Sequence, residues 1–228
     1  MSAVAIVGGS GTGKSTSIGN IPEIEISGLN PKETVLINVA GKDLPFKGGN
    51  KLYSGSVSAN GNLIDTSDAK VISEAIKYIS ESRKDIKNIV IDDSQFIMAF
   101  EFMKKAKESG YGKFADIGVN MSKILDASKN TRKDLTIYFM WHPEKDTDGR
   151  LKMKTVGTMI DNYLTLEGLF TVILYAKVDK GASGKMAYQF VTNQDGQYPA
   201  KSPIGMFKDL YIKNDLGLVS KLIAEYYN

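Results

Sequence analysis

The feature that most constrains this chain is the segment GGSGTGKST at residues 8–16, which directly follows the apolar run AVAIV at residues 3–7. The apolar run predicts a buried strand, and the glycines predict a turn whose backbone takes positive φ and approaches a ligand closely. Residues 8–15 match the pattern G-x-x-x-x-G-K-[ST], in which successive N–H groups line an anion site. We expect residues 14–20 to open a short helix whose positive end adds to that site. This order of elements predicts a phosphate-binding loop.

Each residue type in this loop has its own chemical role. Lys14 is expected to reach the β- and γ-phosphates of a nucleotide, Ser15 to ligate Mg²⁺ through its hydroxyl, and Thr16 to contact the α-phosphate. The other positions predicted to bind the nucleotide are Gly8, Gly9, Ser10, Gly11, Thr12 and Gly13. The sequence therefore predicts a nucleoside triphosphate and Mg²⁺ as ligands.

A second acidic group should lie beside such a loop, at the end of a neighbouring parallel strand. The run NIVIDD at residues 88–93 supplies it. We expect Asp92 to hold Mg²⁺ through its water shell. Asp93 has two interpretations: it orients or deprotonates the attacking water, or it caps a helix that starts near Ser94, since aspartate caps helices well.

A further polar residue follows the strand predicted from LTIYFMW at residues 135–141. This residue is His142, the only histidine in the chain. Ligands of α/β proteins bind at the carboxyl ends of the strands, so His142 is expected to face the γ-phosphate and to report its presence. The alternative is a surface histidine before a loop proline.

Strands and helices alternate along the chain, which predicts an α/β fold with a mostly parallel sheet flanked by helices. Residues 1–228 are expected to form one domain. Gly181 to Gly184 should turn a C-terminal antiparallel hairpin. Residues 40–66 are rich in Gly, Asn and Ser and predict a loop with a small hairpin. The remaining predicted elements are strands at 34–38, 169–178 and 185–191, and helices at 95–107, at 113–129, at 215–227 and from a cap at Ser67 or Asp68.

Composition excludes several classes of protein. The chain has no cysteine, so thiol catalysis, disulfides and zinc–thiolate sites are excluded. No apolar run approaches the ~20 residues that a membrane span needs, and no basic leader precedes the first apolar run. These features favour a cytoplasmic protein. The net charge of +3 is too small to indicate nucleic-acid binding by itself.

Four segments give the chain a resemblance to the RecA-like phage ATPases of single-strand annealing and recombination, which are also described as AAA-type ATP-binding proteins. The segments are GGSGTGKST, TVLINVAGKDLPFKG at 34–48, NIVIDDSQF at 88–96 and GQYPAKSPIGMF at 196–207. The resemblance implies a RecA-like core, Mg²⁺-dependent ATP hydrolysis and action on single-stranded DNA in phage recombination or replication. It also implies homo-oligomers with the nucleotide at the subunit interface, a location in the host cytoplasm, and an annealing or single-strand binding protein as a partner.

The resemblance also implies roles for further residues. A basic residue from the next subunit should reach the γ-phosphate, and Arg150 and Lys201 fit that role. RecA itself has a catalytic glutamate after its second strand, whereas the strand at 34–38 is followed here by no glutamate. The hydrolytic base is therefore open among three acidic residues: Asp93, Asp43 and Glu144.

Two lysine-containing segments are predicted to contact DNA. They are Lys145–Lys154, with Arg150, Lys152 and Lys154, and Lys42–Lys51. Their interspersed acidic residues fit an ordinary solvated loop as an alternative.

Three other functions compete with the ATPase. A P-loop kinase acting on a nucleoside or nucleotide needs arginines that neutralise the transferred phosphate, and this chain has only Arg83, Arg132 and Arg150, well separated. A nucleotide-gated assembly module would bind ATP without efficient hydrolysis. A motor acting on protein or on duplex DNA shares most sequence features with the leading interpretation.

Overall fold

A central β-sheet organises the protein. The structure is a computed structural model that describes residues 3–157, 160–161, 164–180 and 184–227. In this part of the chain the sheet has eight strands in the order β10-β9-β8-β1-β5-β4-β2-β3. Their bounds are Ala3–Val7 (β1), Thr34–Asn38 (β2), Leu63–Asp65 (β3), Asn88–Asp92 (β4), Thr136–Trp141 (β5), Val172–Lys180 (β8), Met186–Val191 (β9) and Tyr211–Lys213 (β10).

The strands from β8 to β3 run parallel, and β9 and β10 pair antiparallel with their neighbours. The predicted α/β class, its mostly parallel sheet and the antiparallel pairing of the last long strands are confirmed. Residues 181–183 of the predicted hairpin turn lie outside the described residues.

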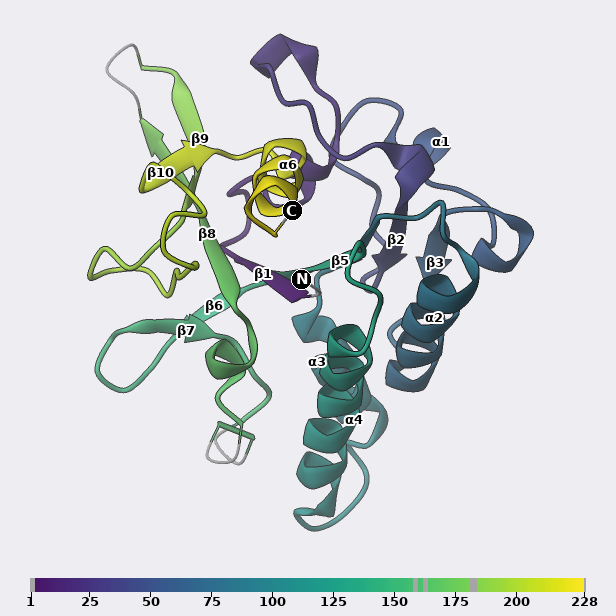
Figure 1. The fold of residues 1–228 in the computed structure, drawn as a ribbon. Coiled ribbons are helices and arrows are strands. Elements are labelled where there is room, and N and C mark those ends of the chain that lie inside the picture. The colour runs from purple at the N-terminus through teal and green to yellow at the C-terminus, as the bar shows by residue number, and fades with distance from the viewer. Residues whose placement is uncertain (1–2, 158–159, 162–163, 181–183, 228) are drawn as a thin grey trace.

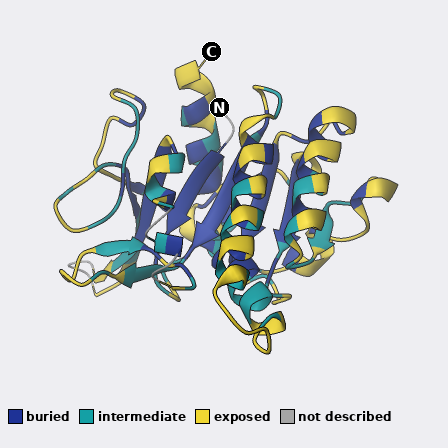
Figure 2. Cartoon of the chain, turned by 90° about the horizontal axis from the view of Figure 1, so that it is seen from below, coloured by how far each residue is buried: buried dark blue, intermediate teal, exposed yellow. Residues whose placement is uncertain are grey.

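Helices cover both faces of the sheet (Figure 1). On one face lie α2 (Ala69–Ser82), α3 (Gln95–Lys104) and α4 (Gly112–Lys129), and on the other lies α6 (Leu216–Tyr227). Strand side chains alternate between the two cores: Ala5 of β1 joins the core under α2–α4, whereas Ile6 joins the core under α6. Both faces are therefore apolar, as expected for parallel strands, and Figure 2 shows the strands buried beneath helices with exposed outer faces.

A short helix does form within residues 14–20, as expected, but it covers only part of that range. The chain forms only a 3-10 helix at Ser15–Ile18 after the glycine-rich loop. The sheet face beside this short helix is covered instead by α6, which contacts it. A single 3-10 turn has little macrodipole, so the loop's own N–H groups must supply most of any attraction for an anion.

Two loop predictions also need correction. Residues 40–66 contain no hairpin: they hold the short helix α1 (Gly49–Leu52), and their last strand, β3, pairs parallel with β2 at the sheet edge. A small antiparallel sheet of β6 (Pro143–Lys145) and β7 (Leu151–Met153) occupies a segment expected to be a loop. The other 3-10 helices described are Pro22–Ile24, Pro31–Glu33, Val57–Ala59 and Leu166–Leu169.

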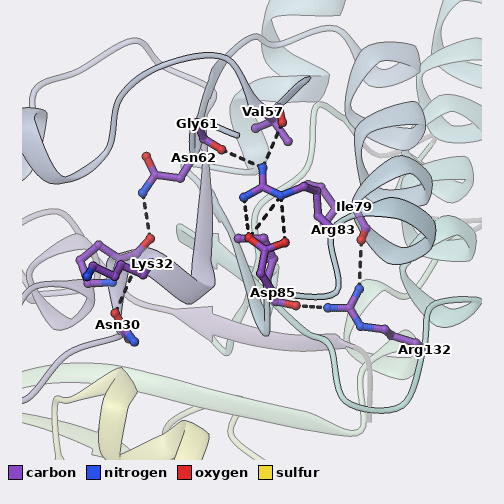
Figure 3. Close-up of polar contacts among 11 residues, drawn as sticks. Asn30, Lys32, Val57, Gly61, Asn62, Ile79, Arg83, Asp85 and Arg132 are labelled. Atoms are coloured by element: carbon purple, nitrogen blue, oxygen red, sulfur yellow. Dashed lines mark hydrogen bonds and ion pairs between the residues drawn. The ribbon is translucent and has the colours of Figure 1, made fainter. Parts of the chain in front are cut away.

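Arginines stabilise the amino ends of the parallel strands (Figure 3). Arg83 lies just before β4, donates to the carbonyls of Val57 and Gly61 at 3.0 and 3.1 Å, and pairs with Asp85 at 2.7 Å. Arg132, just before β5, donates to the Ile79 carbonyl at 3.0 Å. These two arginines therefore have structural roles at the end of the sheet opposite to the glycine-rich loop.

Candidate functional site

The glycine-rich loop leaves the carboxyl end of β1 and presents unpaired backbone donors. The Gly8 N–H donates to the Trp141 carbonyl at 3.0 Å, but among the described residues nothing accepts a hydrogen bond from the N–H groups of residues 9–16. Gly13 has a φ of +85°, and a Cβ on Gly8 would lie 2.8 Å from the Ala176 carbonyl oxygen. Such an array of free donors in a loop that only glycine can form is suited to bind an anion.

Lys14 is folded back onto this loop. Its ammonium donates to the carbonyls of Gly8 and Gly9 at 2.6 and 2.8 Å, and only 6% of the residue is exposed. Burial lowers the pKa of Lys14 to about 8, against the opposing charges of Asp93 and Asp92. A phosphate group in the loop would favour the charged ammonium, so the position of Lys14 fits its predicted role.

Ser15 and Asp92 are brought together, as the sequence predicts. The Ser15 hydroxyl donates to Asp92 Oδ1 at 3.0 Å, and Asp92 is buried at the end of β4. Burial, followed by the neighbouring Asp93 charge, raises the pKa of Asp92. A nearby cation would offset that cost by favouring the ionised carboxylate.

These two residues fit Mg²⁺ only as part of a nucleotide complex. The described residues contain no cluster of three or more His, Cys, Asp or Glu side chains that could hold a metal alone. Mg²⁺ usually keeps several waters and takes one or two protein oxygens together with substrate phosphates. A hydroxyl and a carboxylate beside a phosphate loop supply that donor set.

Asp93 does not cap a helix, so that interpretation is wrong. The helix α3 begins at Gln95 with Ser94 as its N-cap, and no side chain caps it. The Asp93 carboxylate instead forms an ion pair with Lys42, and its Oδ1 lies 3.4 Å from His142 Nε2. Burial acts to raise the pKa of Asp93, but hydrogen bonds to His142 and Lys42 outweigh it and leave the pKa below its usual range. Asp93 is thus a buried carboxylate, ionised at neutral pH.

The backbone at Asp93 is also unusual. Its φ is +55°, a left-handed conformation that costs an L-residue roughly 1–2 kcal/mol. Strained residues of this kind are concentrated at functional sites. The turn after β4 therefore aims the Asp93 side chain at its two basic neighbours and not along α3.

His142 lies at the tip of β5, which is the strand between β1 and β4. Its side chain is 25% exposed, contacts Asp93 and stands edge-on to Phe96 at 6.5 Å between ring centroids. It also lines the same cavity as Lys14 and Asp92. The structure thus places this histidine within the site, and the surface alternative does not hold. Its role as a reporter of the γ-phosphate stays a prediction.

These groups surround one cavity of about 370 Å³. Its polar lining is Ser10, Gly11, Gly13, Lys14, Ser15, Thr16, Lys42, Asp43, Asp92, Asp93, His142 and Asn214, and its apolar lining is Ile24, Ile26, Pro45 and Tyr188. A lining that includes both polar and apolar residues suits a ligand with a charged chain and a flat apolar group. Of the three acidic residues left open as the base, Asp93 and Asp43 line the cavity and Glu144 does not.

The other predicted residues lie elsewhere. Glu144 pairs with Lys152 at 3.2 Å within the β6–β7 sheet. Arg150 is exposed in the turn between those strands. Lys201 pairs through its backbone with Ile173 of β8, at 2.8 and 2.9 Å. Neither basic residue lines the cavity of its own chain, and their contribution to a neighbouring subunit stays a prediction.

Sequence reasoning missed several lining residues. Lys42 is predicted from the sequence only as part of a DNA-binding segment. It closely follows β2, which pairs with β4, the strand that ends at Asp92. Its proximity to Asp93 could therefore have been inferred from the order of the strands. Asn214, whose amide donates to the Thr12 carbonyl at 3.1 Å, and Tyr188 come from the last quarter of the chain. No local pattern marks these two residues.

Comparisons with known proteins do not assign this site. No protein-family model matches the chain, and a search of curated proteins finds no match. Among the described residues, no helix combines the length and the apolar character that crossing a membrane requires. The chemistry of the site is therefore argued from its own geometry.

Proposed function

We propose that this protein is a Mg²⁺-dependent ATPase of the RecA-like type that acts with single-stranded DNA. The observation that carries the proposal is the convergence of three groups in one cavity: the unpaired amides of residues 9–16, the Lys14 ammonium, and the hydrogen-bonded pair of Ser15 and Asp92. Each group would have a partner on a Mg²⁺–triphosphate: the amides and Lys14 suit phosphate oxygens, and Ser15 and Asp92 suit the metal.

Different residues of the cavity have different roles in the proposed hydrolysis. The loop amides and Lys14 bind the phosphates, and Ser15 and Asp92 would hold Mg²⁺, which neutralises charge when bound. Water attacks the γ-phosphorus while the bond from that phosphorus to the β–γ bridging oxygen breaks, so that ADP and phosphate form. Asp93 accepts the proton of the water, because it is the ionised, buried carboxylate of the cavity. His142, beside Asp93 Oδ1, orients that carboxylate.

The DNA and subunit parts of the proposal come from the resemblance. Lys47 and Lys51 are exposed on the segment after β2, next to the cavity, and Arg150 is exposed on the β6–β7 turn. These positions are accessible to a nucleic-acid backbone or to a neighbouring subunit. Lys152, in contrast, pairs with Glu144 and Asp161, so it is less available to DNA.

The kinase alternative is weakened by the arginines. Arg83 and Arg132 are bonded to carbonyls at the amino ends of the strands, remote from the cavity. Only Arg150 is left to neutralise a transferred phosphate. A lid of arginines, as phosphoryl transfer to a small molecule usually requires, is not available within the described residues.

ATP turnover with and without single-stranded DNA tests the proposal. Wild-type protein should release phosphate faster with DNA, Lys14→Ala should lose turnover by roughly a hundredfold or more, and Lys32→Ala, an exposed lysine outside the cavity, should match wild type. Turnover indifferent to DNA, with phosphate appearing on a nucleoside or nucleotide, would favour the kinase.

A mixing experiment tests the proposed subunit contact. Mixing Lys201→Ala with Asp92→Ala protein should restore activity, and no rescue at any ratio would contradict a shared site.

A further inference from the structure

Lys42 and Lys14 are the lysines that line the cavity. The Lys42 side chain is 60% exposed, whereas its partner Asp93 is 4% exposed. Apart from the Lys42 ammonium, no donor in the described part of the chain reaches Asp93 Oδ2. The ion pair thus joins an accessible side chain to a buried carboxylate whose Oδ1 faces His142 and whose Oδ2 has Lys42 as its one described partner.

The backbone of Lys42 is held in place while its side chain is not. The Asn38 amide donates to the Lys42 carbonyl at 2.9 Å, and Asn38 Oδ1 accepts the Lys42 N–H at 3.3 Å. Between them Gly41 turns the chain with a φ of +63°. The Lys42 ammonium can therefore exchange partners by rotation of its side chain alone.

The charges in the cavity indicate which partner it would take. Lys42 and Lys14 line the same cavity, so their like charges repel each other across it. An anion that contacts both would relieve this repulsion. In the proposed nucleotide site Lys14 binds the β- and γ-phosphates, and Lys42 approaches from the side of Asp93, the proposed base.

We propose that Lys42 is the ligand that distinguishes a nucleoside triphosphate from a diphosphate. Without a terminal phosphate, Lys42 occupies Asp93. When a γ-phosphate enters, Lys42 moves onto it, and Asp93 Oδ2 is released to accept the proton of the attacking water. The inference rests on the proposed nucleotide site and adds the residue that couples the γ-phosphate to the base.

Binding of ATP and ADP, each with Mg²⁺, to wild type and variants tests this role by calorimetry. Lys42→Ala should weaken ATP binding about tenfold, the effect of losing one hydrogen bond to a charged group, and should change ADP binding less than about twofold. Lys42→Arg should retain part of the ATP preference. Lys32→Ala, an exposed lysine that lies outside the cavity and outside the segments predicted to contact DNA, is the control and should bind both nucleotides like wild type.

A second variant, Asp93→Asn, tests the same role even if Lys42→Ala does not fold. Asp93→Asn keeps a residue that tolerates the left-handed backbone, and it frees Lys42, so it should bind ATP at least as tightly as wild type while turnover falls. Equal losses of ATP and ADP affinity in Lys42→Ala, or no loss of ATP affinity, would overturn the role of Lys42. If wild type binds neither nucleotide, the proposed function itself fails, and the Lys42 inference fails with it.

Discussion

The two ends of the parallel sheet differ in how many of their polar groups have partners. At the amino ends, Arg83 and Arg132 donate to backbone carbonyls, and each forms an ion pair with an aspartate. At the carboxyl ends, loop amides lack acceptors, Asp93 has a left-handed backbone, and Asp92 is buried with a raised pKa. Buried polar groups normally find partners, so the amino end is organised for stability, and we propose that a ligand completes the carboxyl end.

Asp92→Asn should show the largest effect at the carboxyl end. It removes the carboxylate charge that is proposed to hold Mg²⁺. The metal's expected contribution of several kcal/mol corresponds to roughly a thousandfold in turnover. The free energy of unfolding at pH 7 should not fall, because the carboxamide oxygen can still accept from Ser15 and the cost of a buried charge disappears. Steady-state phosphate release and urea denaturation measure the two quantities. A large loss of stability would mean that Asp92 is a structural residue.

Arg83→Ala should show the reverse pattern. Two carbonyls and Asp85 lose a buried partner, which should lower the free energy of unfolding by about 2–4 kcal/mol. Turnover per folded molecule should be unchanged. Lys77→Ala, an exposed position on the preceding helix α2, is the control and should stay within about 0.5 kcal/mol. If folded Arg83→Ala protein lost turnover, the amino end of the sheet would contribute to activity as well as to stability, against our comparison.

Titration of Lys14 sharpens the comparison. Burial lowers the pKa of Lys14 to about 8 in the free protein, although the charges of Asp93 and Asp92 oppose this shift. Above that pH, Lys14 must therefore take up a proton when ATP binds. ATP affinity should be flat below pH 8 and fall by up to about tenfold per pH unit above it. Calorimetry in two buffers of different ionisation enthalpy measures the proton uptake. Affinity that is independent of pH from 7 to 9.5 would contradict the assigned role of Lys14.

The smallest effect concerns Asp85 at the amino end. The Arg83 hydrogen bonds lower the pKa of Asp85, so their contribution to stability is present above the usual carboxyl range and is lost as pH falls through the lowered pKa. The difference in unfolding free energy between wild type and Arg83→Ala should therefore shrink as the pH falls from 7 through the lowered pKa of Asp85. Since Asp85 is 54% exposed, solvent screening keeps this change small. A difference that grows in acid would mean that the ion pair does not stabilise the fold.

Much of the fold could be predicted because parallel strands carry strong local signals. The apolar runs at β1, β2, β4 and β5 identified the strands, and the residues that follow three of them located the loop, the aspartates and His142. The 3-10 form of the helix at Ser15–Ile18 was not foreseen, and neither was its contact with α6, which comes from the end of the chain. Asn214 and Tyr188 reach the cavity through tertiary packing alone. Lys42 was within reach of the sequence, since strand order places it beside Asp93.

A titration of the purified protein with ATP and Mg²⁺ at pH 7 tests the central claim most directly. The account predicts saturable binding to one site per chain, weakened at least about tenfold in Lys14→Ala and unchanged in Lys32→Ala. If wild-type protein takes up neither adenine nor guanine triphosphate at millimolar concentration, the cavity at the carboxyl ends of the strands is not a nucleotide site.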